Sequence, residues 1–315
     1  MQIEYKGKKY VFEGKVTPIE VAKKIGIDLK PILIAEVNGE LSDLSRNIPG
    51  DAKIDFFSFD SNGGRKVFWH SSAHILATAV KRLYPDAVLG IGPSIDEGFY
   101  YDFYNLKIGD NDLEKIEKEA KKVVDEDLKF IRTEKTIQGA KKEIANNKFK
   151  LEILDNLKGT VSFYSNGEFS DLCRGPHIPS TRYVKALKLL KVAGAYWRGD
   201  SSKEVMTRIY GISFPSKKDM DEYLKMIEER KEHDHKKIGK ELGLFFFSEE
   251  SPGSPFFLPN GTVVYNELIR FARELDLKYD YQEIITPIIA KIDVWKTSGH
   301  FDKYRENMYK VSPFS

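Results

Sequence analysis

"FWHSSAHILATAV", residues 68–80, is an apolar run that carries two histidines near its start, His70 and His74. Its composition and length predict a buried helix over about residues 71–84. Residues four apart lie on one face of a helix, so the two imidazoles should point the same way. They are candidates for metal ligands, for catalytic bases or for ordinary core residues.

A second pair with the same spacing follows about a hundred residues later, Cys173 and His177 in "DLCRGPH". His-x3-His and Cys-x3-His together offer four ligands that zinc accepts. Taken singly, a buried histidine or a lone cysteine is more often a packing residue than a ligand. The second pair, however, holds the chain's one cysteine and lies beside Asp171, Arg174 and the turn Gly175-Pro176. This coincidence favours one shared site.

The composition excludes several classes of protein. The chain has 315 residues, 41% of them hydrophobic, and a net charge of +2, which indicates globular domains without a general attraction to nucleic acid. Local basic patches could still bind tRNA. One cysteine cannot form a disulfide framework, and no apolar run approaches the roughly 18 residues of a membrane span. The polar start "MQIEYKGKKY" is unlike a signal peptide, so we expect a cytoplasmic protein.

Residues 1–61 are predicted to form a small domain of their own. Lys6-Gly7-Lys8 joins two alternating runs as a hairpin, and Thr17 is a plausible N-cap of a short helix. Asn38-Gly39 predicts a second hairpin. Strand, strand, helix, strand, strand is the order of a ubiquitin-like β-grasp domain. Residues 61–64, Ser-Asn-Gly-Gly, are expected to be a flexible linker.

The rest of the chain predicts an α+β, multidomain protein. Residues 65–215 should form a larger α+β domain with helices near 112–127 and 135–147 and strands around glycine turns. Residues 216–242 are highly charged and predict a connector helix. Residues 243–315 begin a further domain.

Three weaker patterns have common structural explanations. "GIGPSIDEG" is rich in glycine but lacks the G-x-G-x-x-G spacing of a dinucleotide site. The lysines of 114–150 could face phosphates, although such runs are more often solvated helix faces. The aromatic pairs Tyr100-Tyr101 and Tyr196-Trp197 could stack on a base, although aromatic residues beside glycines in strands more often pack.

In order along the chain, "WHSSAHILATAV", "IGPSIDEGFYYDF", "DLCRGPHIPST", "AGAYWRGD" and "DHKKIGKELGLF" resemble bacterial-type threonyl-tRNA synthetases. The resemblance covers essentially the whole chain, and the β-grasp segment resembles the family's TGS domain. Alanyl-tRNA synthetases and their free-standing editing relatives share the His/Cys pattern. They do not place it after a TGS domain or before "KTSGHFDKY", which resembles the start of the threonyl catalytic core.

The resemblance implies that 243–315 is the incomplete start of a class II aminoacylation core. Helix 262–276 and strand 281–288 resemble motif 1, which builds the homodimer interface of full-length members. Motifs 2 and 3 would lie beyond Ser315, together with the residues that bind ATP, magnesium and the catalytic-core zinc. We therefore expect the front part of a threonine–tRNA ligase, which does not activate threonine by itself.

The expected activity is editing, the hydrolysis of mischarged Ser-tRNA(Thr). The partner would be tRNA(Thr), bound through its 3′ aminoacyl-adenosine. Three alternatives remain: a stand-alone protein that edits in trans, a non-catalytic tRNA-binding or regulatory module, and a zinc hydrolase of another substrate. A natural stop codon after residue 315 would favour the first, and loss of the four His/Cys residues would favour the second.

The resemblance also assigns residues to the editing site. The catalytic candidates are His70, His74, Lys150, Cys173 and His177, and the substrate-binding candidates are Tyr101, Asp171, Arg174 and Tyr196. Asp171 would pair with the substrate's ammonium group. No obligate metal is expected in this domain. If zinc binds there, its ligands are His70, His74, Cys173 and His177.

Overall fold

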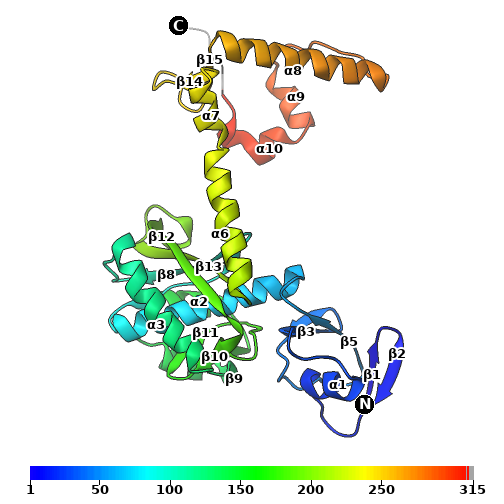
Figure 1. Cartoon of the computed structure of the whole chain (residues 1–315), viewed down its shortest axis with the longest axis vertical. Coiled ribbons are helices and arrows are strands. Elements are labelled where there is room, and N and C mark those ends of the chain that lie inside the picture. The colour runs from blue at the N-terminus through cyan, green and yellow to red at the C-terminus, as the bar shows by residue number, and fades with distance from the viewer. Residues whose placement is uncertain (310, 312–315) are drawn as a thin grey trace. The chain divides into compact units, whose positions relative to one another are not determined.

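The computed structural model describes residues 1–309 and 311 and divides into two compact units, Met1–Ile227 and Glu228–Ser315 (Figure 1). Residues 310 and 312–315, the end of the predicted 243–315 segment, lie outside the described residues. No helix in the described part of the chain is long and apolar enough to cross a membrane.

The first unit begins with the β-grasp domain. Its elements are β1 (Gln2–Tyr5), β2 (Lys8–Val11), α1 (Pro18–Ile25), β3 (Ile34–Val37), β4 (Glu40–Ser42) and β5 (Ala52–Phe57). The sheet order is β2-β1-β5-β3-β4, with β1 and β5 parallel at its centre. The predicted β-grasp fold is confirmed, and β5 is an additional strand that the sequence analysis did not assign.

Local sequence explains why these elements form. Lys6 and Gly7 both have positive φ, as do Asn38 and Gly39, so each pair builds the tight turn whose twist suits a hairpin. Thr17 caps α1 in a capping box with Glu20, as predicted for the N-cap.

A larger α+β part completes the first unit around the long helix α2 (Asn62–Leu83). The main sheet has the order β12-β13-β8-β6, with β7 paired to β8, and packs on α2 together with α3. These elements are β6 (Val88–Leu89), β7 (Ser94–Ile95), β8 (Gly98–Tyr104), α3 (Leu113–Asp125), β12 (Ala186–Tyr196) and β13 (Val205–Phe214). Short 3-10 turns lie at Asp110–Asp112, Thr181–Tyr183 and Trp197–Gly199.

α2 begins nine residues earlier than predicted, at Asn62 rather than Ser71, so the predicted flexible linker is wrong. Ser61 Oγ accepts the N–H of Gly64 at 3.0 Å and caps the helix. A Cβ on Gly64 would lie 2.0 Å from the Ser58 carbonyl oxygen. The glycine is therefore required by a close backbone approach, and it does not serve as a hinge.

A smaller sheet, in the order β11-β10-β9, carries the second half of the site. Its strands and helices are β9 (Ile131–Thr136), α4 (Ile137–Glu143), α5 (Lys148–Asp155), β10 (Thr160–Asn166) and β11 (Phe169–Leu172). The predicted helix 135–147 is shorter than expected, because Thr136 caps α4 and Asn147 caps a separate helix, α5.

The connector is two helices rather than one: α6 (Lys217–Glu232), which spans the boundary between the units, and α7 (His235–Glu241). Asp234 separates them because its carboxylate accepts the backbone N–H groups of Lys236 and Lys237 and starts α7.

The second unit continues with β14 (Phe245–Phe247), β15 (Pro255–Phe257), α8 (Pro259–Lys278), α9 (Ile292–Thr297), α10 (His300–Tyr304) and a 3-10 turn at Arg305–Asn307. The predicted strand 281–288 is wrong: these residues have no regular structure, and Ile285 is 94% exposed. A strand needs a paired neighbour, and none of the described residues pairs with this segment.

Candidate active site

The two histidine-containing pairs meet in the first unit. His70 and His74 lie in the middle of α2, and Cys173 and His177 lie in the loop after β11. One ligand atom from each of the four residues lies within 4.8 Å of the others. His70 Nε2 is 3.0 Å from Cys173 Sγ, which is 3.4 Å from His177 Nε2. The prediction that the pairs come together is confirmed; we call these four residues the His/Cys cluster.

Hydrogen bonds to groups outside the cluster orient the imidazoles of His70 and His177. His70 Nδ1 lies 2.9 Å from the Gly92 carbonyl oxygen and must carry a proton, so Nε2 faces the Cys173 thiol as an acceptor. Ser71 Oγ lies 2.8 Å from the Val67 carbonyl oxygen and 2.9 Å from His177 Nδ1. With the hydroxyl donating to Val67, His177 donates to Ser71 through Nδ1, and its Nε2 is a second acceptor beside the thiol. Two acceptor nitrogens then face one thiol proton.

His74 differs from the other two histidines. It is 1% exposed, and its Nδ1 has no hydrogen-bond partner within the described chain. Buried polar atoms of this kind normally have a partner, which can be a water or an ion. His74 therefore has a buried ring nitrogen with free hydrogen-bonding capacity.

Burial makes the cluster neutral. Desolvation lowers the pKa of His70 and takes the pKa values of His74 and His177 well below 6.5. Desolvation also raises the pKa of the Cys173 thiol to about 12. At neutral pH the imidazoles are uncharged, each with one ring proton, and the sulfur holds its proton. The cluster can accept a proton from water, whereas Cys173 is not an activated nucleophile.

A buried polar triad, Lys150, Asp171 and Tyr101, adjoins the cluster. Lys150 Nζ lies 2.8 Å from both carboxylate oxygens of Asp171, and Tyr101 donates its hydroxyl to Asp171 Oδ2 at 2.6 Å. The charges of Lys150 and Asp171 are close enough to influence the pKa of His70. Burial, with the Asp171 charge second, raises the pKa of Tyr101 well above its usual value, so its hydroxyl stays a donor.

Asp171 has a structural role in this triad. Both of its carboxylate oxygens accept hydrogen bonds within the fold, so Asp171 holds Lys150 and Tyr101, and its contact with a substrate ammonium group stays a prediction. α5 supplies Lys150 because Phe149, next to it, packs on Trp197. A Cβ on Gly92 would lie 2.2 Å from the Tyr101 ring. Gly92, the second glycine of "GIG", therefore leaves room for the Tyr101 ring.

Arg174 and Tyr196 are exposed, Tyr196 by 47% of its surface. Among the described residues, neither side chain forms a hydrogen bond or an ion pair with the cluster or the triad. Their substrate-binding roles stay predictions. The sequence analysis missed four contributors to the site: Asp43, Ser71, Tyr164 and the Gly92 carbonyl. Ser71 could have been found from its position between the two histidines, whereas the contacts of Asp43 arise only from tertiary structure.

The donor set of the His/Cys cluster fits zinc in type, with three imidazoles and one thiol. Its spacing does not match a formed site. A tetrahedral zinc would hold a nitrogen and a sulfur ligand about 3.6 Å apart, whereas His70 Nε2 and Cys173 Sγ are at the hydrogen-bond distance of 3.0 Å. A metal would require the pair to separate and the thiol to lose its proton.

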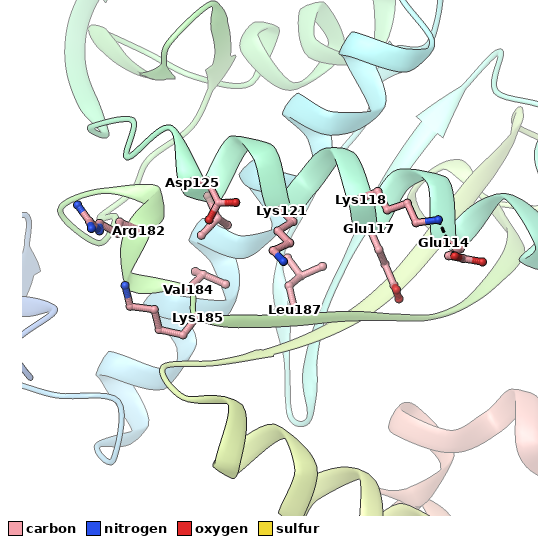
Figure 2. Close-up of a pocket in the computed structure, with 10 residues that line it drawn as sticks. Glu114, Glu117, Lys118, Lys121, Asp125, Arg182, Val184, Lys185 and Leu187 are labelled. Atoms are coloured by element: carbon pink, nitrogen blue, oxygen red, sulfur yellow. Dashed lines mark ion pairs between the residues drawn. The ribbon is translucent and has the colours of Figure 1, made fainter.

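A hollow of about 510 Å³ lies elsewhere, between α3 and the start of β12 (Figure 2). Its lining mixes both signs of charge, and Lys118 pairs with Glu114 at 2.7 Å, one turn apart on α3. Alternating, paired charges are typical of a solvated helix face rather than a phosphate site. It contains no residue of the His/Cys cluster.

Comparisons with known proteins agree with the motif resemblance. Residues 5–58 match the TGS domain, and residues 161–210 match the threonyl and alanyl tRNA synthetase second additional domain. The chain is 49% identical over 308 residues to the threonine–tRNA ligase of Clostridioides difficile, an alignment covering 95% of this chain and 48% of the relative. It is 47% identical over 311 residues to that of Thermotoga maritima, covering 97% and 48%.

A third relative, the threonine–tRNA ligase of Acetivibrio thermocellus, is 50% identical over 300 residues, which cover 93% of this chain and 47% of the relative. The chain thus spans about half the length of the curated relatives that it matches. The predicted resemblance to the N-terminal part of bacterial threonyl-tRNA synthetases is confirmed.

Proposed function

We propose that this chain is the N-terminal, editing part of a bacterial threonine–tRNA ligase, and that its His/Cys cluster hydrolyses mischarged Ser-tRNA(Thr). One observation carries the proposal. Two pairs separated by about a hundred residues converge on one cluster beside a buried lysine, in a chain that resembles these ligases over 95% of its length. The domains we propose are a TGS domain at 1–61, an editing domain at 65–215, a connector at 216–242 and the start of the catalytic core at 243–315.

The chemistry needed is the hydrolysis of an aminoacyl ester. It requires a positioned water, a proton acceptor, and a donor for the developing oxyanion. Neutral imidazoles supply the acceptor: His74 Nδ1 is unpartnered within the described residues, and His70 Nε2 competes with His177 Nε2 for one thiol proton. Lys150 supplies the donor, because only two of its three ammonium hydrogens are needed for Asp171, while Tyr101 holds Asp171 with its one hydroxyl proton. We assign Cys173 to the pocket wall and to proton exchange with its two histidine neighbours.

The need for such a site follows from the similarity of the two amino acids. Serine lacks only the methyl group of threonine, and a synthetic site gains about 1–3 kcal/mol of discrimination from one methyl group. A second site that accepts the smaller seryl group and excludes the threonyl group removes the error. The close packing around the cluster is consistent with such a size limit: the ring centroids of His74 and His177 are 4.3 Å apart.

The proposal assigns no obligate metal to hydrolysis. If zinc does bind, His70, His74, Cys173 and His177 would hold it, and the metal would supply an acidified water. For the whole enzyme we propose ATP-dependent aminoacylation of tRNA(Thr) by a cytoplasmic homodimer. The ATP, magnesium and zinc of that reaction belong to the part of the relatives that this chain does not span.

The test is serine release from Ser-tRNA(Thr) by the 315-residue chain, with Thr-tRNA(Thr) as the size control. We expect serine to be released and threonine to be spared. A sample dialysed against a chelator should keep its activity, whereas loss on chelation and recovery with zinc would make the cluster a metal site. Equal hydrolysis of both substrates would contradict the double sieve.

A further inference from the structure

Asp43 connects the β-grasp domain to the His/Cys cluster. It follows β4 and is 8% exposed. Its Oδ1 accepts the backbone N–H of His177 at 2.8 Å, and its Oδ2 accepts the hydroxyl of Tyr164 at 2.7 Å. These partners lie 134 and 121 residues away along the chain. One carboxylate therefore bridges two segments of the neighbouring domain.

Tyr164 is the second part of this bridge. It lies on β10, opposite Asp171 of β11, and is 1% exposed. The centroid of its ring is 4.5 Å from that of the His177 ring. A Cβ added to Gly175 would lie 2.2 Å from the Tyr164 hydroxyl oxygen. The tyrosine thus lies directly against the loop that carries Cys173 and His177. By holding its hydroxyl, Asp43 fixes one side of that loop, and by binding the His177 N–H it fixes the loop's own backbone.

The two bonds help to place the His177 imidazole, together with the rings stacked on it and the Ile178 N–H, which donates to Ser71 Oγ at 3.1 Å. With its backbone held, His177 reaches Ser71 Oγ at 2.9 Å through Nδ1 and Cys173 Sγ at 3.4 Å through Nε2. A shift of the backbone would break both contacts, because hydrogen bonds weaken steeply with distance and angle.

The packing at this seam is interrupted on the Asp43 side. A hollow of about 640 Å³ lies beside Asp43, bounded by the β-grasp segment 43–47 and by residues 127, 129–132 and 177–180 of the larger domain. Neighbouring rings pack closely on the His177 imidazole, and the carboxylate adds a constraint on the loop backbone at the side where the hollow lies.

We propose that Asp43 is a positioning residue for editing: the β-grasp domain holds His177 in place in the cluster through this carboxylate. The inference rests on the proposed function for its activity measurement. It assigns to the β-grasp domain a part in hydrolysis that is separate from any contact with tRNA.

The activity test uses single-turnover serine release from Ser-tRNA(Thr) at saturating protein. Asp43→Ala removes both acceptors, and we expect the rate to fall about tenfold or more. Asp43→Asn can still accept from His177 and donate to the Tyr164 oxygen, and should stay within about threefold of the parent. The matched control is Asp51→Ala, because Asp51 accepts the Gln2 N–H at 2.6 Å inside the β-grasp domain. It should leave the rate unchanged.

A second measurement separates failure of the inference from failure of the proposed function. The ring-nitrogen chemical shifts of His177, recorded at one pH on folded protein, report its hydrogen bonds without any substrate. They should change in Asp43→Ala and not in Asp51→Ala. If the parent chain releases no serine, the shifts still test the positioning role. Unchanged shifts in Asp43→Ala, or equal loss of activity in Asp43→Ala and Asp51→Ala, would overturn the inference.

Discussion

Replacing Lys150 with methionine should destabilise the first unit strongly. Lys150 and Asp171 have side chains only 4% and 5% exposed and form a buried ion pair. Removing one partner of such a pair typically costs about 3–5 kcal/mol, because the other charge stays buried. Tyr101 still donates to Asp171 in the variant, so we expect the lower end, about 3 kcal/mol. Methionine fills the space of the lysine methylenes, so little of the loss should come from a cavity.

For a domain of this size, 1 kcal/mol corresponds to about 2–4 °C, so the melting temperature should fall by about 6–12 °C. Fluorescence of Trp69 and Trp197, both buried in the first unit, follows the transition. The double variant Lys150→Met with Asp171→Asn removes the orphaned charge and should recover at least about half of the loss.

Lys148→Met is the matched control, because Lys148 lies on the same helix but pairs with Glu204 at the surface. It should change the melting temperature by no more than about 2 °C. A fall of less than about 2 °C for Lys150→Met, or no recovery in the double variant, would refute the buried-pair reasoning.

Three further predictions concern the cluster and its loop. Burial lowers the pKa values of His74 and His177 in the folded chain, so below about pH 6.5 the unfolded chain binds protons more readily than the folded chain. The free energy of unfolding should then fall by up to about 1.4 kcal/mol per pH unit for each histidine. Urea unfolding between pH 7.5 and 5.5 should show this slope, and a flat profile would contradict it. Cys173, with a pKa of about 12, should react with iodoacetamide at pH 8 at least about 100-fold more slowly in the folded chain than in urea, and equal rates would show an exposed thiolate. In Gly175→Ala, the new Cβ would lie 2.2 Å from Tyr164 at a position with positive φ. Gly7 also has positive φ, but a Cβ there would meet open space, so Gly175→Ala should lower the melting temperature more than Gly7→Ala. Equal effects would mean that the loop is not held as described.

Local patterns were sufficient for much of the fold. The Lys6-Gly7 turn needs positive φ at two successive positions, and the Thr17 cap needs a Thr–Glu spacing of three, so both can be recognised within a few residues. The helix that carries His70 and His74 was predicted from its apolar composition. Its start was not, because Gly64 is selected by a close approach to Ser58 that only the folded chain contains.

The sequence predicted that the two His/Cys pairs converge, but it did not predict the hydrogen-bond partners of their polar atoms. The paired spacings identified the His/Cys cluster, but the partner of each polar atom depends on residues far apart in sequence. Asp171 illustrates this, because nothing in "DLCRGPH" reveals that its two carboxylate oxygens hold Lys150 and Tyr101. Strand 281–288 failed for a related reason, since a strand depends on a neighbour that the local sequence does not reveal.

The most direct test of the account is the single-turnover rate of serine release from Ser-tRNA(Thr) by His74→Ala. The control is His233→Ala, because His233 is an exposed histidine after α6. The account predicts that the His74 variant, still folded, loses at least about a hundredfold in rate, within the range for a lost general base, while the His233 variant keeps the parental rate. Parental activity in the folded His74 variant would contradict the claim that the His/Cys cluster is the hydrolytic site.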